Sequence, residues 1–168
     1  SRFFFTVPLN RARKEVIQNL FPDTKEMHAD YESMRILVAE DNEVNQIVIK
    51  GLLGKVGAAA DVAENGRKAV SMFESAQPSY DLILMDCEMP ELDGFDATRG
   101  IREIEHARGQ APVNIVALSA HVMDDARDRM QACGMDDHIS KPIVVADLIH
   151  VLDSVATKRQ RTVNSVDS

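Results

Sequence analysis

The 168-residue sequence has no tryptophan, only two cysteines and no apolar run long enough to cross a membrane. A membrane-spanning helix needs about 18 or more consecutive apolar residues. The two cysteines, Cys87 and Cys133, lie far apart and form no Cys-x-x-Cys pair. This favours free thiols in a reducing compartment over a disulfide framework. The apolar stretch FFFTV near the start is short and has no cleavage pattern, so we expect no secretory signal peptide.

Basic charge is also scarce. The formal net charge is −8, and residues 34–152 hold 20 acidic and 11 basic side chains, a net charge of −9. Such an acidic segment argues against nucleic acid as the direct partner and suits a cation site or a basic partner. With 45% hydrophobic residues, the chain can fill a core, and its length suits one ordinary domain plus some extra sequence.

Residues 34–152 alternate between two kinds of apolar pattern. Short apolar runs predict five strands, and helical spacing between and after them predicts five helices. Repeated strand–helix units predict an α/β fold with a parallel sheet covered on both faces. The strands are expected at 35–39, 60–63, 82–86, 114–119 and 137–140, and the helices at 44–56, 66–76, 95–107, 124–133 and 143–155.

Polar residues with a common chemistry follow these predicted strands. Glu40 and Asp41 end the first strand, Asp86 the third and Ser119 the fourth, and Lys141 follows the fifth. The carboxyl ends of parallel strands meet at one edge of a sheet, where chemistry gathers in such folds. We therefore expect the five side chains to lie together.

Three adjacent carboxylates repel one another, and a divalent cation relieves that repulsion. Oxygen ligands without histidine or cysteine favour Mg²⁺ over Zn²⁺. A lysine and a hydroxyl aimed at the same place suit a phosphoryl group, and an aspartate can attack phosphorus to form an acyl phosphate. The pattern thus predicts that Asp86 accepts a phosphoryl group beside Mg²⁺, steadied by Lys141 and Ser119.

Four stretches, ILVAEDNEVNQ, DLILMDCEMPELDG, IVALSA and ISKPI, resemble the receiver domain of two-component response regulators over about residues 34–155. The resemblance implies a flavodoxin-like, doubly wound (βα)5 fold with a five-stranded parallel sheet. It implies that Glu40, Asp41, Asp86 and the backbone carbonyl of Glu88 hold Mg²⁺, with Asp41 a more direct ligand than Glu40. It also implies that Asp86 is phosphorylated, that Ser119 is the switch hydroxyl and that Lys141 is the family's lysine.

Two histidines bear on switching. The switch aromatic of many receivers falls at His138, three residues before Lys141, where this sequence has no tyrosine or phenylalanine. That departure fits receivers that pass phosphate on more than receivers that drive an attached effector. His138 could equally be a half-buried strand residue without a switching role. His121, two residues after Ser119, could reach over the site and tune dephosphorylation, or could simply start a helix.

The first nine residues, SRFFFTVPL, resemble the closing strand of a histidine-kinase ATP-binding domain. The resulting division is a strand remnant at 1–9, a linker at 10–33, a receiver domain at 34–156 and a flexible tail at 157–168. Together the two resemblances imply a C-terminal part of a hybrid sensor histidine kinase, in the cytoplasm, with the parent protein anchored in a membrane. The glycine motifs for ATP and the phosphorylatable-histidine motif are absent, so autonomous kinase activity is not expected. The implied partners are the kinase core and a histidine-phosphotransfer domain, with no nucleic acid and no direct membrane contact.

The first predicted helix carries apolar residues on more than one side. At 100° per residue, five of them fall within about 140° and are expected to face the core: Val48, Ile49, Leu52, Leu53 and Val56. Val44 and Ile47 lie outside that arc, so we expect an exposed apolar patch on which a partner helix could dock. The alternative is a helix that is buried more completely.

Two other functions compete with the phosphoacceptor. A phosphatase of the haloacid-dehalogenase type also uses an aspartate nucleophile and Mg²⁺, but it needs Asp-x-Asp, where this chain has Asp86-Cys87-Glu88. The other is a receiver-shaped interaction domain that is never phosphorylated. The complete set of acids, hydroxyl and lysine disfavours it.

Overall fold

The computed structural model describes residues 31–120 and 124–166. The expected strand at 1–9, most of the linker at 10–33 and His121 lie outside these residues. Strands and helices alternate, and their bounds are β1 (Ile36–Ala39), α2 (Glu43–Lys55), β2 (Ala60–Ala63), α3 (Gly66–Ser75), β3 (Leu82–Asp86), α4 (Gly94–Arg108), β4 (Asn114–Ser119), α5 (Asp124–Cys133), β5 (Asp137–Ser140) and α6 (Val145–Val166).

The strands form a single five-stranded sheet in the order β2-β1-β3-β4-β5. Every neighbouring pair is parallel. Because the chain runs from β1 outward to β2 and then returns to β3 on the other side of β1, the sheet has a topological switch between β1 and β3, where ligands of such folds bind. The α/β fold class predicted from the sequence is confirmed.

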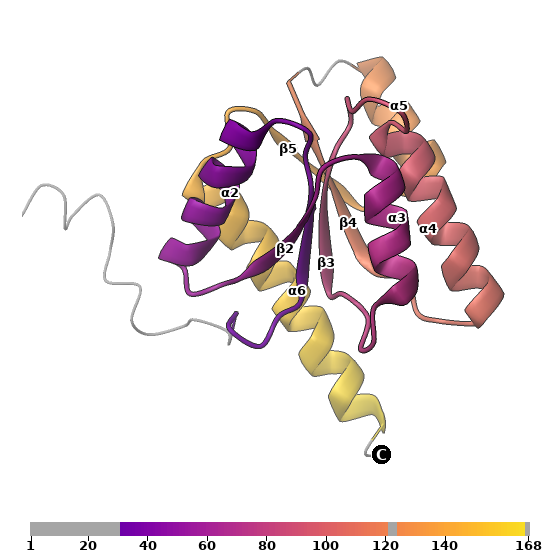
Figure 1. The fold of residues 1–168 in the computed structure, drawn as a ribbon. Coiled ribbons are helices and arrows are strands. Elements are labelled where there is room, and N and C mark those ends of the chain that lie inside the picture. Colours follow the sequence, from indigo (N-terminus) through magenta and orange to yellow (C-terminus); the bar gives the residue numbers. More distant parts are fainter. Residues whose placement is uncertain (1–30, 121–123, 167–168) are drawn as a thin grey trace, which may run out of the picture.

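The sheet is covered on both faces, as Figure 1 shows. Helices α2 and α6 lie on one face and α3, α4 and α5 on the other. Alternate residues of β1 separate accordingly, since Ile36 and Val38 belong to the apolar cluster under α2 and α6. Leu37 and Ala39 belong to the cluster under the other three helices. Burial on both faces explains why the strands read as nearly continuous apolar runs.

Short polar residues fix where three helices begin at the carboxyl edge of the sheet. The Asn42 side chain accepts hydrogen bonds from the backbone N–H groups of Val44 and Asn45 at the start of α2. Asn65 and Asp93 cap α3 and α4 in the same way. These caps satisfy N–H groups that have no partner within the helix.

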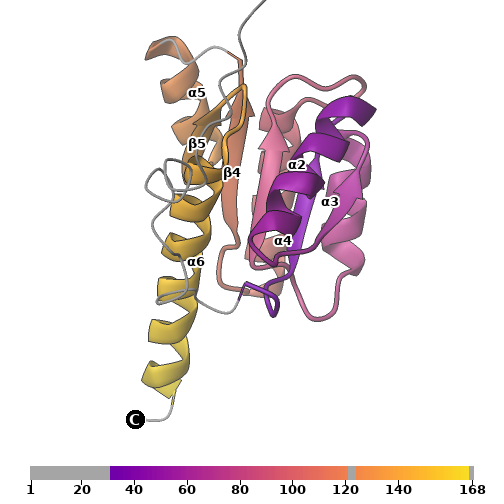
Figure 2. The same ribbon diagram turned by 90° about the vertical axis from the view of Figure 1, so that its left-hand side faces the viewer.

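Helix α6 departs from the sequence prediction. It was expected at 143–155 and followed by a flexible tail from 157, but it begins at Val145 and continues to Val166. Both views show it extending past the amino-terminal edge of the sheet (Figures 1 and 2). The apolar stripe ends near Val155, yet residues 157–166 contain no glycine or proline and several good helix formers, so nothing ends the helix there.

Polar contacts hold this extension against the domain. Lys158 Nζ donates to Asn114 Oδ1 at 2.6 Å, and the Arg159 guanidinium lies 3.3 Å from Asp81 Oδ1. Further up the helix, Asp153 accepts a hydrogen bond from the Tyr31 hydroxyl. Tyr31 falls within the expected linker but is only 2% exposed, so the folded unit already includes it.

Candidate phosphoryl-acceptor site

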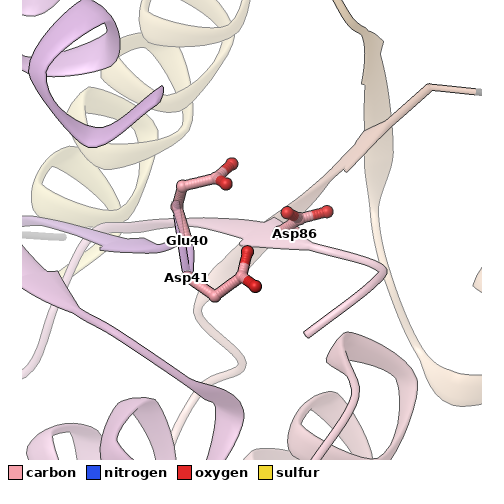
Figure 3. Close-up of side chains that lie close together, drawn as sticks. All are labelled: Glu40, Asp41 and Asp86. Atoms are coloured by element: carbon pink, nitrogen blue, oxygen red, sulfur yellow. The ribbon is translucent and has the colours of Figure 1, made fainter. Parts of the chain in front are cut away.

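The side chains predicted to form a site do meet at the carboxyl edge of the sheet. Glu40 and Asp41 follow β1, Asp86 is the last residue of β3, Ser119 ends β4 and Lys141 follows β5. Figure 3 shows the three carboxylates facing a common space. All five residues line one cavity of about 240 Å³, together with Asn42, Asn45, Glu88 and Ala120.

Lys141 bridges two of the acids. Its ammonium group donates to Asp86 Oδ2 at 2.7 Å and to Glu40 Oε2 at 2.8 Å. Its backbone N–H also donates to the Ser119 carbonyl at 2.8 Å, which ties the loop after β5 to the end of β4. Glu40 is fully buried and Asp86 is 4% exposed, whereas Asp41 is exposed. The site therefore has two buried carboxylates under one cation and a third at its mouth.

Burial is the main influence on Asp86 and raises its pKa, because hydrogen bonds from Lys141 and the Glu88 N–H oppose it only in part. Burial also acts to raise the pKa of Glu40, but hydrogen bonds from Lys141 and Asn45 outweigh it, so that pKa is lowered. Burial acts to lower the pKa of Lys141, and its bonds to the two carboxylates reverse this and raise it. Glu40 is thus held as an anion and Lys141 as a cation, beside an aspartate with raised basicity.

The loop between β3 and α4 is folded tightly against Asp86. The Glu88 N–H donates to Asp86 Oδ1 at 3.2 Å, and the Gly94 N–H donates to the Cys87 carbonyl at 3.2 Å. A Cβ at Gly94 would lie 2.1 Å from the carbonyl oxygen of Asp86. Only glycine permits this approach, which explains the Asp93-Gly94 pair that closes the loop.

Two further residues were predicted to take part in the site, His138 and Glu88. His138 lies in β5, paired with Ala117 of β4, and its side chain is 25% exposed. Its switching role stays a prediction. The side chain of Glu88 is exposed at the site, and the role of its carbonyl in holding a cation also stays a prediction.

The exposed apolar patch is present. Val44 and Ile47 are 66% and 70% exposed, as expected. The expectation that Val48 faces the core is wrong, since it is 48% exposed. Ile49 and Leu53 form the buried stripe of α2, and Val48 lies about 100° around the helix from Ile49. Val144, before α6, is also 49% exposed. We call Val44, Ile47 and Val48 the α2 patch.

Sequence reasoning missed three polar residues around Glu40. Asn45 Nδ2 donates to Glu40 Oε1 at 2.9 Å, and the backbone N–H of Asn42 donates to the same oxygen at 3.3 Å. Gln46 Nε2 donates to the Glu40 backbone carbonyl at 2.7 Å. The sequence feature that could have indicated them is the polar run that follows Glu40-Asp41. These groups reach Glu40 only because the chain turns into α2 at this point.

The chemistry of the donors suits a hard divalent cation. Carboxylate oxygens of Glu40, Asp41 and Asp86 lie within 4.8 Å of one another. Oxygen-only donors with an open side are typical of Mg²⁺ sites, which retain several water ligands. Both oxygens of the fully buried Glu40 already accept hydrogen bonds from the protein, whereas the carboxylate of Asp41 is exposed at the mouth of the site, so Asp41 is better placed than Glu40 as a direct ligand.

Comparison with known proteins identifies the family. The profile of the response regulator receiver domain matches residues 36–153. The chain is 41% identical over 127 residues to hybrid signal transduction histidine kinase I of Dictyostelium discoideum, covering 74% of this chain and 7% of that protein. Kinase K of the same organism is 31% identical over 171 residues, covering 99% of this chain and 14% of its own length. The chain belongs to the response regulator receiver domain family, and it spans a small fraction of these relatives.

The solved structures that resemble this chain are also receiver domains. The receiver domain of sensor histidine kinase PA1611 from Pseudomonas aeruginosa, with a magnesium ion in its active-site cleft, has 39% identity and a TM-score of 0.65, covering 74% of this chain and 98% of that one. The receiver domain of the Arabidopsis thaliana histidine kinase CKI1, with Mg²⁺ and BeF₃⁻, has 30% identity and a TM-score of 0.66, covering 74% and 90%. The receiver domain of Saccharomyces cerevisiae Ssk1, crystallised with the phosphotransfer protein Ypd1, has 29% identity and a TM-score of 0.70, covering 75% and 90%.

These likenesses confirm the flavodoxin-like receiver fold, and the Mg²⁺ expectation agrees with both the acidic cluster and the magnesium-bound relatives. They leave no support for the haloacid-dehalogenase alternative. No helix within 31–120 or 124–166 combines the length and the apolar character that crossing a bilayer requires.

Proposed function

We propose that this receiver domain accepts a phosphoryl group from phosphohistidine on Asp86 in a Mg²⁺-dependent reaction, and relays it to a histidine-phosphotransfer partner. The observation that carries the proposal is the placement of Lys141 Nζ, 2.7 Å from Asp86 Oδ2 and 2.8 Å from Glu40 Oε2. Asp86, which is buried and has a raised pKa, is thereby held beside the ammonium group of Lys141 at the open carboxyl edge of the sheet.

The transfer is an in-line displacement at phosphorus. An Asp86 oxygen forms the new O–P bond while the P–N bond to the donor imidazole breaks. The electron pair of that bond returns to the imidazole nitrogen, which takes up a proton from solvent. Lys141 pairs with one phosphoryl oxygen, and the Ser119 hydroxyl donates to another, so charge on the transferred group meets fixed donors.

Asp41 and Asp86 would hold Mg²⁺ most directly, with Glu40 behind them and the Glu88 carbonyl alongside. When bound, the cation supplies positive charge that offsets the three carboxylates and the incoming phosphoryl oxygens. Without it, Lys141 alone faces three acids, so we expect little acceptance in a chelator.

The test is phosphorylation with phosphoramidate or acetyl phosphate and Mg²⁺, followed by intact mass. We expect one added phosphoryl group, absent in Asp86→Asn and in EDTA. Asp128→Asn makes the same chemical change at an exposed position on α5 and should behave as wild type. An Asp86→Asn protein phosphorylated at the wild-type rate would refute the assignment. A folded wild-type protein that takes no phosphoryl group, even from a phosphorylated phosphotransfer domain, would instead favour a phosphate-independent interaction domain.

The α2 patch supports a helical protein as the partner. It begins two residues after the cap residue Asn42 and so lies beside the acid site. Exposed valine and isoleucine at helical spacing suit a helix that docks with its apolar side. Ssk1, whose receiver shares this fold, was crystallised with the phosphotransfer protein Ypd1. We propose a histidine-phosphotransfer domain as the protein that docks on this patch.

Docking and chemistry can be separated by changing the donor. Val44→Ser with Ile47→Ser should slow transfer from a phosphorylated phosphotransfer domain by at least about tenfold, which corresponds to roughly 1.4 kcal/mol. The same protein should react normally with phosphoramidate, which needs no docking surface. Lys55→Ser, at the far end of α2, is the control. Equal losses with both donors would contradict the docking role.

The wider setting is also a proposal. The alignment with kinase K covers 99% of the chain, which supports a hybrid histidine kinase as the parent protein. The resemblance of residues 1–9 to the end of an ATP-binding domain points the same way. We propose a cytoplasmic location for this part and membrane anchoring for the parent. Phosphorylation would shift the population of a state in which Ser119 has moved toward the phosphoryl group, with His138 as the adjacent switch position.

A further inference from the structure

Glu40 is the most enclosed charged group of the site, with none of its surface exposed. Its Oε2 accepts from Lys141 at 2.8 Å. Its Oε1 accepts from Asn45 Nδ2 at 2.9 Å and from the Asn42 N–H at 3.3 Å. A buried carboxylate needs several donors to remain ionised, and here all except Lys141 come from the start of α2.

Asn45 is not needed to cap this helix. The Asn42 side chain already accepts from the N–H groups of Val44 and Asn45, at 2.9 and 3.2 Å. The Asn45 side chain instead turns toward the site, where it lines the cavity. Asn45 and Lys141 are thus both side-chain donors to the Glu40 carboxylate, one to each oxygen.

The contacts form a continuous chain. Asn45 holds one oxygen of Glu40 at 2.9 Å, the other oxygen holds Lys141 at 2.8 Å, and Lys141 holds Asp86 at 2.7 Å. Because Oε1 is held by α2, Oε2 is directed at the lysine. Without that hold, the Glu40 side chain could rotate, and Lys141 would lose the partner that fixes it over Asp86.

We propose that Asn45 is a positioning residue for phosphoryl acceptance, acting through Glu40 to set the place of Lys141 and the strength of cation binding. This inference rests on the proposed function of the site. Partners that orient metal ligands typically change affinity or rate by about 10–100-fold when removed. Asn45→Leu keeps the size of the side chain and removes both its donor and its acceptor.

The first measurement is the rate of acceptance from phosphoramidate at saturating Mg²⁺. We expect Asn45→Leu to be at least about tenfold slower, with urea unfolding showing a folded protein. Asn45→Asp, which replaces a donor by a like charge facing Glu40, should be slower still. Asn114→Leu, at the opposite edge of the sheet, is the matched control and should react normally. An Asn45→Leu protein with a wild-type rate would overturn the proposal.

A double-mutant cycle separates positioning from a general effect on folding. If Asn45 acts through Glu40, then Asn45→Leu should have little further effect on the rate in a Glu40→Ala protein. The same fold loss in both backgrounds would overturn the proposal, because the asparagine would then act independently of Glu40.

Cation binding gives a readout that needs no phosphoryl transfer. Binding of Mn²⁺ alone, followed by electron paramagnetic resonance, should weaken by about tenfold in Asn45→Leu and remain unchanged in Asn114→Leu. If the wild-type protein accepts no phosphoryl group, the proposed function fails, and the Mn²⁺ result still decides the role of Asn45. Equal Mn²⁺ affinity in wild type and Asn45→Leu would overturn it.

Discussion

Replacing Lys141 by methionine should make the stability of the protein depend on the cation. Lys141 is the partner shared by Glu40 and Asp86, whose side chains are 0% and 6% exposed. Methionine fills a similar volume and leaves two buried carboxylates without their cation. Removing one partner of a buried ion pair typically destabilises a protein by about 3–5 kcal/mol, a large part of a typical domain stability of about 5–15 kcal/mol.

The loss can be measured by urea unfolding in EDTA, monitored by circular dichroism. For a urea dependence of about 2 kcal/mol per M, a loss of about 4 kcal/mol lowers the midpoint by roughly 2 M. Part of the penalty is relieved by protonation of Asp86, whose pKa burial already raises, so the difference from wild type should shrink as the pH is lowered. Lys68→Met removes an exposed lysine paired with Glu64 and should change stability by less than about 1 kcal/mol.

Mg²⁺ should restore much of the loss. A ligand at 100 times its dissociation constant stabilises the folded state by about 2.7 kcal/mol. In Lys141→Met the cation no longer competes with an ammonium group, so the gain in midpoint on adding Mg²⁺ should exceed that of wild type. A variant as stable as wild type in EDTA would refute the reasoning, since it would show that the two buried acids do not both carry charge beneath the lysine.

Three further results are expected. Gly94→Ala should lower phosphoryl acceptance and shift the urea midpoint downward, because its Cβ would lie 2.1 Å from the carbonyl oxygen of the acceptor aspartate; unchanged acceptance would contradict the tight loop. Burial and hydrogen bonds raise the pKa of Tyr31 and Tyr80, the two tyrosines of the chain, to about 12. Their stabilising contribution is therefore fully present below about pH 10 and lost as the pH rises toward 12, and absorbance at 295 nm should show phenolate appearing near pH 12 and not near 10. Glu105→Ala should destabilise the protein by about 1–3 kcal/mol, since it leaves the buried Val113 N–H without its acceptor, while Arg102 loses one carboxylate at 2.8 Å and keeps its ion pair with Asp136; an unchanged urea midpoint would refute this.

The sequence predicted the sheet and the main site residues because both follow from short-range patterns. Apolar runs such as LILM end in Asp86, and parallel strands place such ends at one edge. The positions of Glu40, Asp41, Ser119 and Lys141 follow from that rule alone, and the structure brings them into one cavity.

Side-chain networks could not be predicted in this way. The hydrogen bond from Asn45 to Glu40 depends on how α2 turns after its cap residue. The order of residue types does not predict which way an asparagine side chain points. Val48 was placed in the core because the apolar arc fixes the buried face only to within about one residue step. Its exposure depends on which neighbours cover the helix, and that is a tertiary property.

The end of α6 was missed for a related reason. An apolar stripe reports which part of a helix packs on a core, and this stripe ends near Val155. The helix continues because Lys158 and Arg159 bond to Asn114 and Asp81, which are distant in sequence. Likewise, Tyr31 was assigned to a linker because its partner, Asp153, lies 122 residues away along the chain.

The bond between Tyr31 and Asp153 joins the segment that leads into the domain to the helix that leads out of it. The Arg159 guanidinium adds a second bond there, 3.4 Å from the Ser33 carbonyl. The segment at residues 31–33 and helix α6 are therefore hydrogen-bonded to each other at the edge of the sheet opposite Asp86. Because these contacts lie at the edge of the sheet opposite Asp86, they join the first and last described segments of the domain and leave the acidic site uncovered.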